Sequence, residues 1–199
     1  MSKWDSKYEY IKNLGEGGNA DVFMVHRKSD SAKYALKQLK SDRLNAEKKY
    51  RFKEEVKIMS EKHRIGMLPV LEVSSLSGKN YWYTMPVAKT ISKHIKSNCL
   101  NLVDIINGFI QLTETLCELH KENISHRDIK PDNIYYYEDR FTLGDFGLVN
   151  YPDMEQRFTT DSKWLGAMFT IAPEMRQNPK SADGCKADVI HLQKPYGYY

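Results

Sequence analysis

The first forty residues alternate between apolar and polar side chains, the pattern of β-strands with one buried face. Three such stretches follow one another, YEYIKNLG at 8–15, ADVFMVHRK at 20–28 and KYALKQLK at 33–40. The glycine-rich segment GEGGN lies between the first two and predicts a tight turn. Two further strands are predicted at 68–74 and 81–85, with SLSGKN turning between them.

Helical periodicity occurs twice. Phe52, Val56, Met59 and His63 fall at i, i+4, i+7 and i+11, which predicts one face of a helix that ends near Gly66. Farther along, NLVDIINGFIQLTETLCELHKE predicts a long amphipathic helix. Its broad apolar stripe consists of Leu102, Ile105, Ile106, Phe109, Ile110, Leu116 and Leu119. A strand-rich first half with one helix, followed by a helix-rich second half, predicts two lobes with a cleft between them, hinged near residues 85–89.

Composition narrows the function classes. The 199 residues are 41% hydrophobic and 28% charged with a net charge of +4, as is ordinary for a soluble globular protein. No run of basic residues carries interleaved aromatic side chains, which argues against nucleic-acid binding. No segment has the length of a membrane span or an apolar signal stretch, which argues against a membrane partner. Cys99, Cys117 and Cys185 lie far apart, so we expect reduced thiols and a cytoplasmic location.

One short loop gathers groups that suit phosphoryl chemistry. In SHRDIKPDN, which follows the long helix, Asp128, Lys130 and Asn133 lie within six positions. A carboxylate can orient a hydroxyl and accept its proton, a lysine can neutralise phosphate, and an asparagine can ligate a hard cation. Twelve residues after Asn133, GDFG supplies Asp145 as a second oxygen ligand. A purely structural role, such as Asp128 capping a turn, would explain one of these residues but not the set.

The motifs nearer the N-terminus are weak by themselves. The GEGGN turn offers backbone N–H groups to a phosphate, but most glycine-rich turns between strands are plain hairpin turns. Lys37 in YALK would by default be a solvated strand residue, and Glu55 a surface carboxylate on the first predicted helix. Their order adds weight, because the glycine-rich loop, strand lysine, helix glutamate, HRDxKPxN, DFG and APE follow one another along the chain.

In that order the motifs resemble those of eukaryotic-type serine/threonine protein kinases, and the likeness covers residues 8–189. The resemblance implies an α+β, two-lobed protein-kinase-like fold. Residues 1–88 would form a small β-rich N-lobe with one helix, and residues 89–189 an incomplete helical C-lobe. The resemblance also implies transfer of the γ-phosphoryl group of Mg·ATP to serine or threonine hydroxyls of protein substrates, with ATP and Mg²⁺ as cofactors.

Residue roles follow from the same resemblance. Asp128 would be the catalytic base, and Lys130 would stabilise the transferring phosphoryl group. Asn133 and Asp145 would hold Mg²⁺. Arg127, which precedes the catalytic aspartate, suits control by phosphorylation of the activation loop, where the candidate acceptors are Thr159, Thr160 and Ser162. A polar loop without modification explains those three residues equally well.

Nucleotide-binding residues are implied in the same way. Lys37 would hold the α- and β-phosphates and pair with Glu55. Met85 would be the gatekeeper, while Pro86 and Ala88 would offer backbone groups to adenine. The remaining residues expected around ATP are Ala35 and the glycine-rich loop, namely Leu14, Gly15, Glu16, Gly17, Gly18, Asn19, Ala20, Asp21 and Val22.

Three substitutions depart from the family pattern. Ala20 replaces the third glycine of the loop, and Tyr135 stands where a smaller apolar residue usually lies beneath adenine. Ala167 lacks the hydroxyl that usually links the substrate platform to the catalytic loop, which puts peptide selection in doubt. None of these changes removes a catalytic group.

The C-terminal segment departs further. In the family, Asp188 opens a buried helix that anchors the catalytic loop, and a later helix supplies an arginine that pairs with the APE glutamate, here Glu174. The sequence IHLQKPYGYY places a proline and a glycine where the helix should continue, so we expect helix and arginine to be missing. Shifting the codons by one nucleotide from Val189 permits DVYSFAKTLWVL, which resembles that helix. We therefore expect residues 190–199 to be an out-of-frame tail.

Two hypotheses stay open at this point. The first is an active serine/threonine kinase, favoured by the complete set of catalytic residues. The second is a non-catalytic chain, either an inactive truncated kinase fragment or a nucleotide-binding or scaffold module, favoured because missing helices would expose apolar surface. A kinase of small molecules is disfavoured, since HRDxKPxN and APE together are typical of the protein-kinase branch. The substrate and the oligomeric state do not follow from the sequence.

Overall fold

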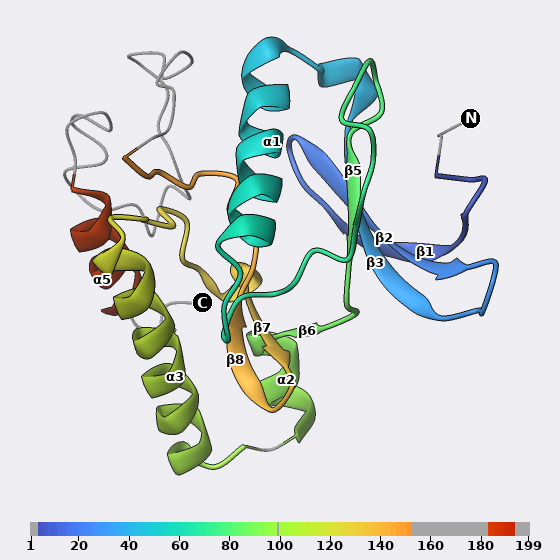
Figure 1. Ribbon diagram of the computed structural model, residues 1–199. Coiled ribbons are helices and arrows are strands. Elements are labelled where there is room, and N and C mark those ends of the chain that lie inside the picture. The colour runs from blue at the N-terminus through green and yellow to red at the C-terminus, as the bar shows by residue number, and fades with distance from the viewer. Residues whose placement is uncertain (1–3, 99, 153–182, 194–199) are drawn as a thin grey trace. The chain divides into compact units, whose positions relative to one another are not determined.

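The computed structural model describes residues 4–98, 100–152 and 183–193. The chain divides into two compact units, one comprising Met1–His63 and Leu68–Ala88, the other Arg64–Met67 and Lys89–Tyr199. The first unit is a sheet with one α-helix, and the second is mainly helical with a small sheet (Figure 1). The predicted α+β fold class, with a β-rich N-lobe and a partial helical C-lobe, is therefore confirmed. Over the described ranges, no helix combines the length and apolarity needed to cross a bilayer.

The first unit contains a five-stranded antiparallel sheet in the order β1-β2-β3-β5-β4. Helix α1 (Ala46–Glu61) follows a short 3₁₀ turn, and the Asn45 side chain caps it by accepting the Lys48 N–H at 2.8 Å. The strands are β1 (Tyr8–Glu16), β2 (Ala20–Arg27), β3 (Lys33–Leu39), β4 (Glu72–Val73) and β5 (Trp82–Met85).

The two faces of this sheet have different partners because side chains alternate along a strand. Trp82 of β5 belongs to a buried hydrophobic cluster with Trp4, Tyr8, Val25 and Leu36. The residues on either side of it in the sequence, Tyr81 and Tyr83, contact Phe52 of α1 instead, with ring centroids 6.1 and 5.4 Å apart. Helix α1 therefore packs on the face opposite the cluster, and Figure 1 shows it running alongside β5.

Two boundary predictions in this unit are wrong. Helix α1 ends at Glu61, so His63 lies beyond it and is exposed. The strand predicted at 68–74 is reduced to Glu72–Val73, in keeping with Pro69, which has no N–H to donate to a sheet. Phe52, Val56 and Met59 do form the buried face, together with Glu55 and Ile58.

The second unit contains a three-stranded antiparallel sheet in the order β6-β7-β8. Its 3₁₀ turn at Pro131–Asn133 leads directly into β7. The elements are β6 (Lys89–Thr90), α2 (Ile91–Asn98), α3 (Leu102–Lys121), β7 (Ile134–Tyr137), β8 (Arg140–Leu143) and α5 (Gly184–Gln193).

Helix α3 has the predicted length but buries only part of its apolar stripe. It starts with a capping box between Asn101 and Asp104, and its buried residues include Leu112, Leu116 and Leu119. The N-terminal half is different, because Leu102, Ile106 and Ile110 are 70, 49 and 51% exposed. The predicted apolar stripe is confirmed, but its N-terminal part lies largely at the surface of the protein.

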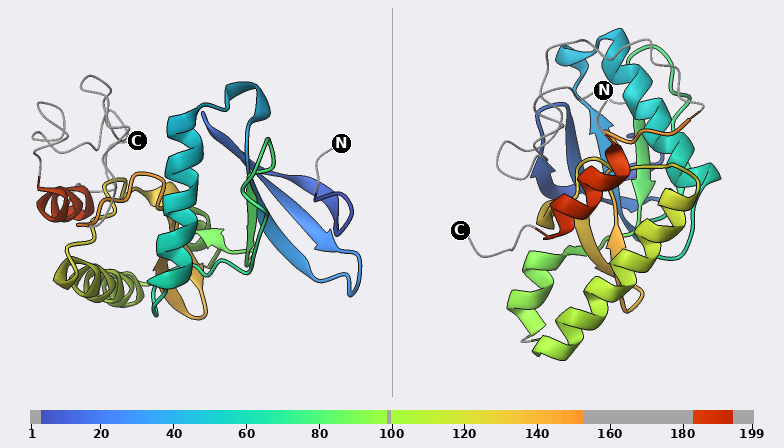
Figure 2. Two further views of the ribbon diagram at one scale, coloured as in Figure 1. Left: turned by 45° about the horizontal axis from the view of Figure 1, so that its top comes forward. Right: turned by 90° about the vertical axis from the view of Figure 1, so that its left-hand side faces the viewer.

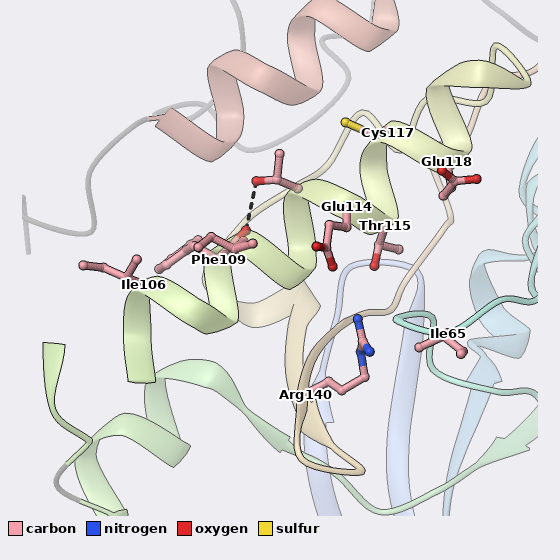
Figure 3. Close-up of a pocket in the computed structure, with 10 residues that line it drawn as sticks. Ile65, Ile106, Phe109, Glu114, Thr115, Cys117, Glu118 and Arg140 are labelled. Carbon is pink, nitrogen blue, oxygen red and sulfur yellow. Dashed lines mark hydrogen bonds between the residues drawn. The ribbon is translucent and has the colours of Figure 1, made fainter. Parts of the chain in front are cut away.

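A groove runs along α3 from Ile106 to Glu118 (Figure 3). It has a volume of about 810 Å³, and Ile65 and Arg140 line it together with α3. The helix residues are Ile106, Phe109, Ile110, Thr113, Glu114, Thr115, Cys117 and Glu118. None of the residues predicted to bind nucleotide or to catalyse transfer lines this groove.

Helix α5 corrects the prediction that no helix continues past Val189. It runs from Gly184 to Gln193, and the Asp183 carboxylate accepts the N–H groups of Cys185 and Lys186 at its start. Residues 190–193 contain no helix breaker, and the first proline comes at 195, outside the described residues. Figure 2 shows α5 beside the C-terminal end of α3. The out-of-frame origin of residues 190–199 stays a prediction.

Candidate active site

The glycine-rich loop joins the first two strands. Leu14, Gly15 and Glu16 lie in β1, Ala20, Asp21 and Val22 lie in β2, and Gly17, Gly18 and Asn19 form the turn. The Gly17 N–H donates to the Ala20 carbonyl at 2.8 Å, and a Cβ on Gly17 would lie only 3.0 Å from that oxygen. The turn therefore favours a glycine at 17, while Ala20 is accommodated as a buried residue of β2.

The strand lysine and the helix glutamate form an ion pair inside the first unit. Lys37 Nζ lies 2.6 Å from Glu55 Oε1, and both side chains are buried. The register between β3 and β5 places Ala35 opposite Met85, which is buried at the end of β5. Pro86 and Ala88 follow in the last residues of this unit.

The catalytic loop of the second unit brings three predicted residues together. Asp128 Oδ2 accepts hydrogen bonds from Lys130 Nζ at 2.8 Å and from Asn133 Nδ2 at 2.9 Å. The same Asn133 amide also donates to the Asp128 carbonyl at 2.8 Å. The carboxylate is thus held in one orientation by a cation and an amide, with 13% of its side chain exposed.

The segment that contains Asp145 is joined to this loop by a backbone hydrogen bond. The Gly144 N–H donates to the Asn133 carbonyl at 3.0 Å, so the residue before Asp145 is bonded directly to the catalytic loop. Asp145 has φ 59° and accepts the Gly147 N–H at 3.3 Å. Because Asn133 gives its Nδ2 to Asp128, its Oδ1 and the Asp145 carboxylate are the candidate oxygen ligands for a cation. Such an oxygen donor set fits Mg²⁺.

His126 is a site residue to which the sequence assigned no role. Its Nδ1 accepts the Asp128 N–H at 3.2 Å, and its Nε2 lies 3.0 Å from the Gly144 carbonyl oxygen. The ring is fully buried, 4.6 Å from that of Phe146. His126 therefore ties the catalytic loop to the GDFG segment, and its place in the HRD motif was the only sequence signal.

Asp188 of α5 anchors the same loop. Its Oδ2 accepts the His126 N–H at 2.7 Å, and its Oδ1 accepts the Arg127 N–H at 2.6 Å. His120 of α3 lies 3.0 Å from Oδ2, and the carboxylate is fully buried. These bonds hold Arg127 in a left-handed conformation, at φ 65°. The anchoring helix that the sequence predicted to be missing is therefore present over the residues that hold the loop.

Of the other residues named from the family pattern, one lies in β7 and the rest lie outside the described residues. Tyr135 lies half-buried in β7, between Thr90 of β6 and Thr142 of β8. The activation-loop and APE positions lie outside the described residues, as Thr159, Thr160, Ser162, Ala167 and Glu174 all do.

Comparison with known proteins places these features in one family. Residues 8–190 match the protein kinase domain family. The chain is 31% identical over 186 residues to the serine/threonine-protein kinase PknD of Chlamydia muridarum, covering 86% of this chain and 18% of that protein. It is 30% identical over 188 residues to a probable serine/threonine-protein kinase of Clostridium acetobutylicum, covering 92% of this chain and 28% of that protein. The chain thus spans a minor part of these relatives, and it belongs to the protein kinase family.

Proposed function

We propose that the chain is an ATP-dependent protein kinase that transfers the γ-phosphoryl group of Mg·ATP to serine or threonine hydroxyls of protein substrates. The observation that carries this proposal is the orientation of Asp128 by Lys130 and Asn133 on a loop anchored by Asp188. An oriented carboxylate can accept the proton of a substrate hydroxyl. The hydroxyl oxygen then bonds to the γ-phosphorus, the bond from that phosphorus to the bridging oxygen breaks, and ADP leaves.

The remaining residues would neutralise the phosphates. The Lys37 ammonium, oriented by Glu55, would bind the α- and β-phosphates, and the N–H groups of the glycine-rich turn would face the triphosphate. Lys130 would counter the charge on the transferring group. Asn133 and Asp145 would hold Mg²⁺, which supplies positive charge to the β- and γ-phosphate oxygens when bound. A cytoplasmic location, ATP and Mg²⁺ as ligands, and serine/threonine-containing proteins as substrates all form part of this proposal.

Thermal unfolding of the 199-residue chain tests nucleotide binding. Mg·ATP at about 100 times its dissociation constant should raise the free energy of unfolding by about 2.7 kcal/mol and shift the midpoint upward. Asp145→Asn should lose that shift because it removes a charged metal ligand. Asp139→Asn is the matched control, since Asp139 is exposed in the turn between β7 and β8 and also has a positive φ. A wild-type midpoint indifferent to Mg·ATP would contradict the proposal.

Phosphoryl transfer from labelled ATP to a generic acceptor such as casein is the second step, with Asp128→Asn as the inactive reference. Binding without transfer would favour the alternative of a nucleotide-binding scaffold. The apolar side chains exposed along α3 are the observation that supports this alternative, since exposed apolar patches often mark protein contacts.

A further inference from the structure

A tyrosine hydroxyl shares the buried carboxylate that pairs with the phosphate-binding lysine. The Tyr83 hydroxyl donates to Glu55 Oε1 at 2.8 Å, and the same oxygen lies 2.6 Å from Lys37 Nζ. Tyr83 is fully buried, and Glu55 is 2% exposed. A buried carboxylate is stable only where donors replace its lost water, and Tyr83 provides a donor without adding charge.

Sheet register and helix period together explain this arrangement. Lys37 of β3 lies directly opposite Tyr83 of β5, so both side chains stand on the face that α1 covers. Phe52 and Met59 of α1 lie about one turn to either side of Glu55. The Phe52 ring centroid is 5.4 Å from that of Tyr83, and Met59 Sδ is 3.9 Å from the tyrosine hydroxyl. The ring is thus held by the helix whose carboxylate it binds.

We propose that Tyr83 is a positioning residue for Lys37. Its hydroxyl fixes the Glu55 carboxylate, and through it the orientation of α1, so that the lysine ammonium is directed for phosphate binding. All three residues belong to the first unit, so this restraint needs no residue of the second. When Lys37 engages a phosphate and shares its charge, the tyrosine bond keeps Glu55 in place. The inference rests on the proposed function, because it assigns a role within the nucleotide site.

The test compares two ligands that differ in phosphate. Dissociation constants for Mg·ATP and for adenosine are measured by calorimetry on the wild type and on Tyr83→Phe. We expect about tenfold weaker Mg·ATP binding in the variant, the effect of one hydrogen bond to a charged group. Adenosine binding should change less than twofold, because adenosine has no phosphate for Lys37 to bind. A general structural defect would weaken both ligands, and that outcome would overturn the inference.

Tyr81→Phe is the matched control. Tyr81 lies two positions earlier, is also buried and packs on Phe52, but in the part of the chain that the structure describes its hydroxyl makes no bond to the ion pair. It should leave both dissociation constants unchanged within twofold. Equal losses of Mg·ATP affinity in Tyr81→Phe and Tyr83→Phe would also overturn the inference. A wild type that binds neither ligand would instead refute the proposed function itself.

A double variant covers the case in which Tyr83→Phe does not fold. Glu55→Gln removes the buried charge, so Tyr83→Phe in that background leaves no carboxylate short of a donor. If Tyr83 acts through Glu55, the double variant and Glu55→Gln should bind Mg·ATP equally within twofold. A further tenfold loss in the double variant would show that Tyr83 acts by another route, and the inference would be wrong.

Discussion

At the residue scale, Tyr8 connects the first strand to β4 through one carboxylate. Its hydroxyl donates to Glu72 Oε2 at 2.6 Å, and the Lys7 ammonium binds the other oxygen of that carboxylate. The ring is buried and meets Trp82 edge-on, with centroids 5.9 Å apart. Burial, followed by the hydrogen bond to Glu72, raises the pKa of Tyr8 to about 12 from its ordinary 10.0.

This pKa makes stability depend on pH in the alkaline range. Between pH 10 and 12 the unfolded chain releases the Tyr8 proton while the folded chain retains it, so the free energy of unfolding falls as pH rises. The wild type should lose about 1.4 kcal/mol between pH 8 and 11 from this group, and Tyr8→Phe should not. Urea titrations at both pH values measure the difference. Tyr10→Phe, at a 53% exposed position, is the control, and parallel pH profiles for wild type and Tyr8→Phe would count against this account.

At the element scale, helix α3 meets the small sheet at a glycine. Gly108 is buried in the middle of the helix, and a Cβ there would lie 2.4 Å from the ring of Phe141 in β8. Glycine is a poor helix residue, since it is roughly 1 kcal/mol less favourable than alanine in a helix interior. Its presence in α3 is therefore explained by the close approach of the Phe141 ring.

Gly108→Ala should accordingly destabilise the protein although it improves helix propensity. Overpacking of a well-packed core typically costs roughly 1–3 kcal/mol, which exceeds the gain in propensity, so we expect a net loss of about 1 kcal/mol. Asn107→Ala at the exposed neighbouring position has the propensity gain alone and should be neutral or stabilising. Chemical denaturation gives both values. A Gly108→Ala protein as stable as Asn107→Ala would show that the ring moves aside freely.

The sequence predicts well those helices and strands whose own residues show a clear hydrophobic period. Alternation defines β1, β2 and β3, and an apolar period of 3.6 residues defines α1 and α3. Helix α2 (Ile91–Asn98) has no such prediction, because only Ile91 and His94 among its described side chains are buried, too few for a clear period. The sequence does not predict the helical residues 190–193, because the proline at 195 and the glycine at 197 indicate that a helix ends before them.

The candidate site likewise contains residues that the sequence predicts and contacts that it does not. Asp128, Asn133 and Asp145 are found in the sequence because they lie in motifs of fixed local spacing, and Lys37 and Glu55 are found because they precede those motifs in the family's order. The Tyr83–Glu55 bond is not found there, because it joins residues 28 positions apart and depends on strand register and helix packing. The bonds of Asp188 to the catalytic loop likewise depend on where α5 packs.

At the scale of the whole molecule, apolar side chains at the surface of the second unit favour self-association. Leu102, Val103, Ile106 and Ile110 of α3 are all exposed, and two of them line the groove seen in Figure 3. Exposed apolar surface of this kind promotes association between molecules.

Replacing Ile106 and Ile110 together by glutamine should therefore reduce self-association. Sedimentation velocity across a range of concentrations should show a smaller associated fraction for the double variant than for the wild type. The thermal midpoint should hardly change, since substitutions at exposed positions usually alter stability by less than about 0.5 kcal/mol. Asn107→Gln, exposed on the same helix, serves as the control and should behave as the wild type. An unchanged associated fraction in the double variant would mean that other surfaces drive association.

The carboxylate of Asp188 also bears on the order in which the chain folds. Its bonds to His126 and Arg127 join residues 62 and 61 positions apart, and the entropy of closing so long a loop must be given up before those bonds form. The hairpin of β1 and β2 and the capping box of α3 close over far fewer residues. We therefore expect the loop at His126–Asn133 to acquire its geometry after the elements with local contacts have formed.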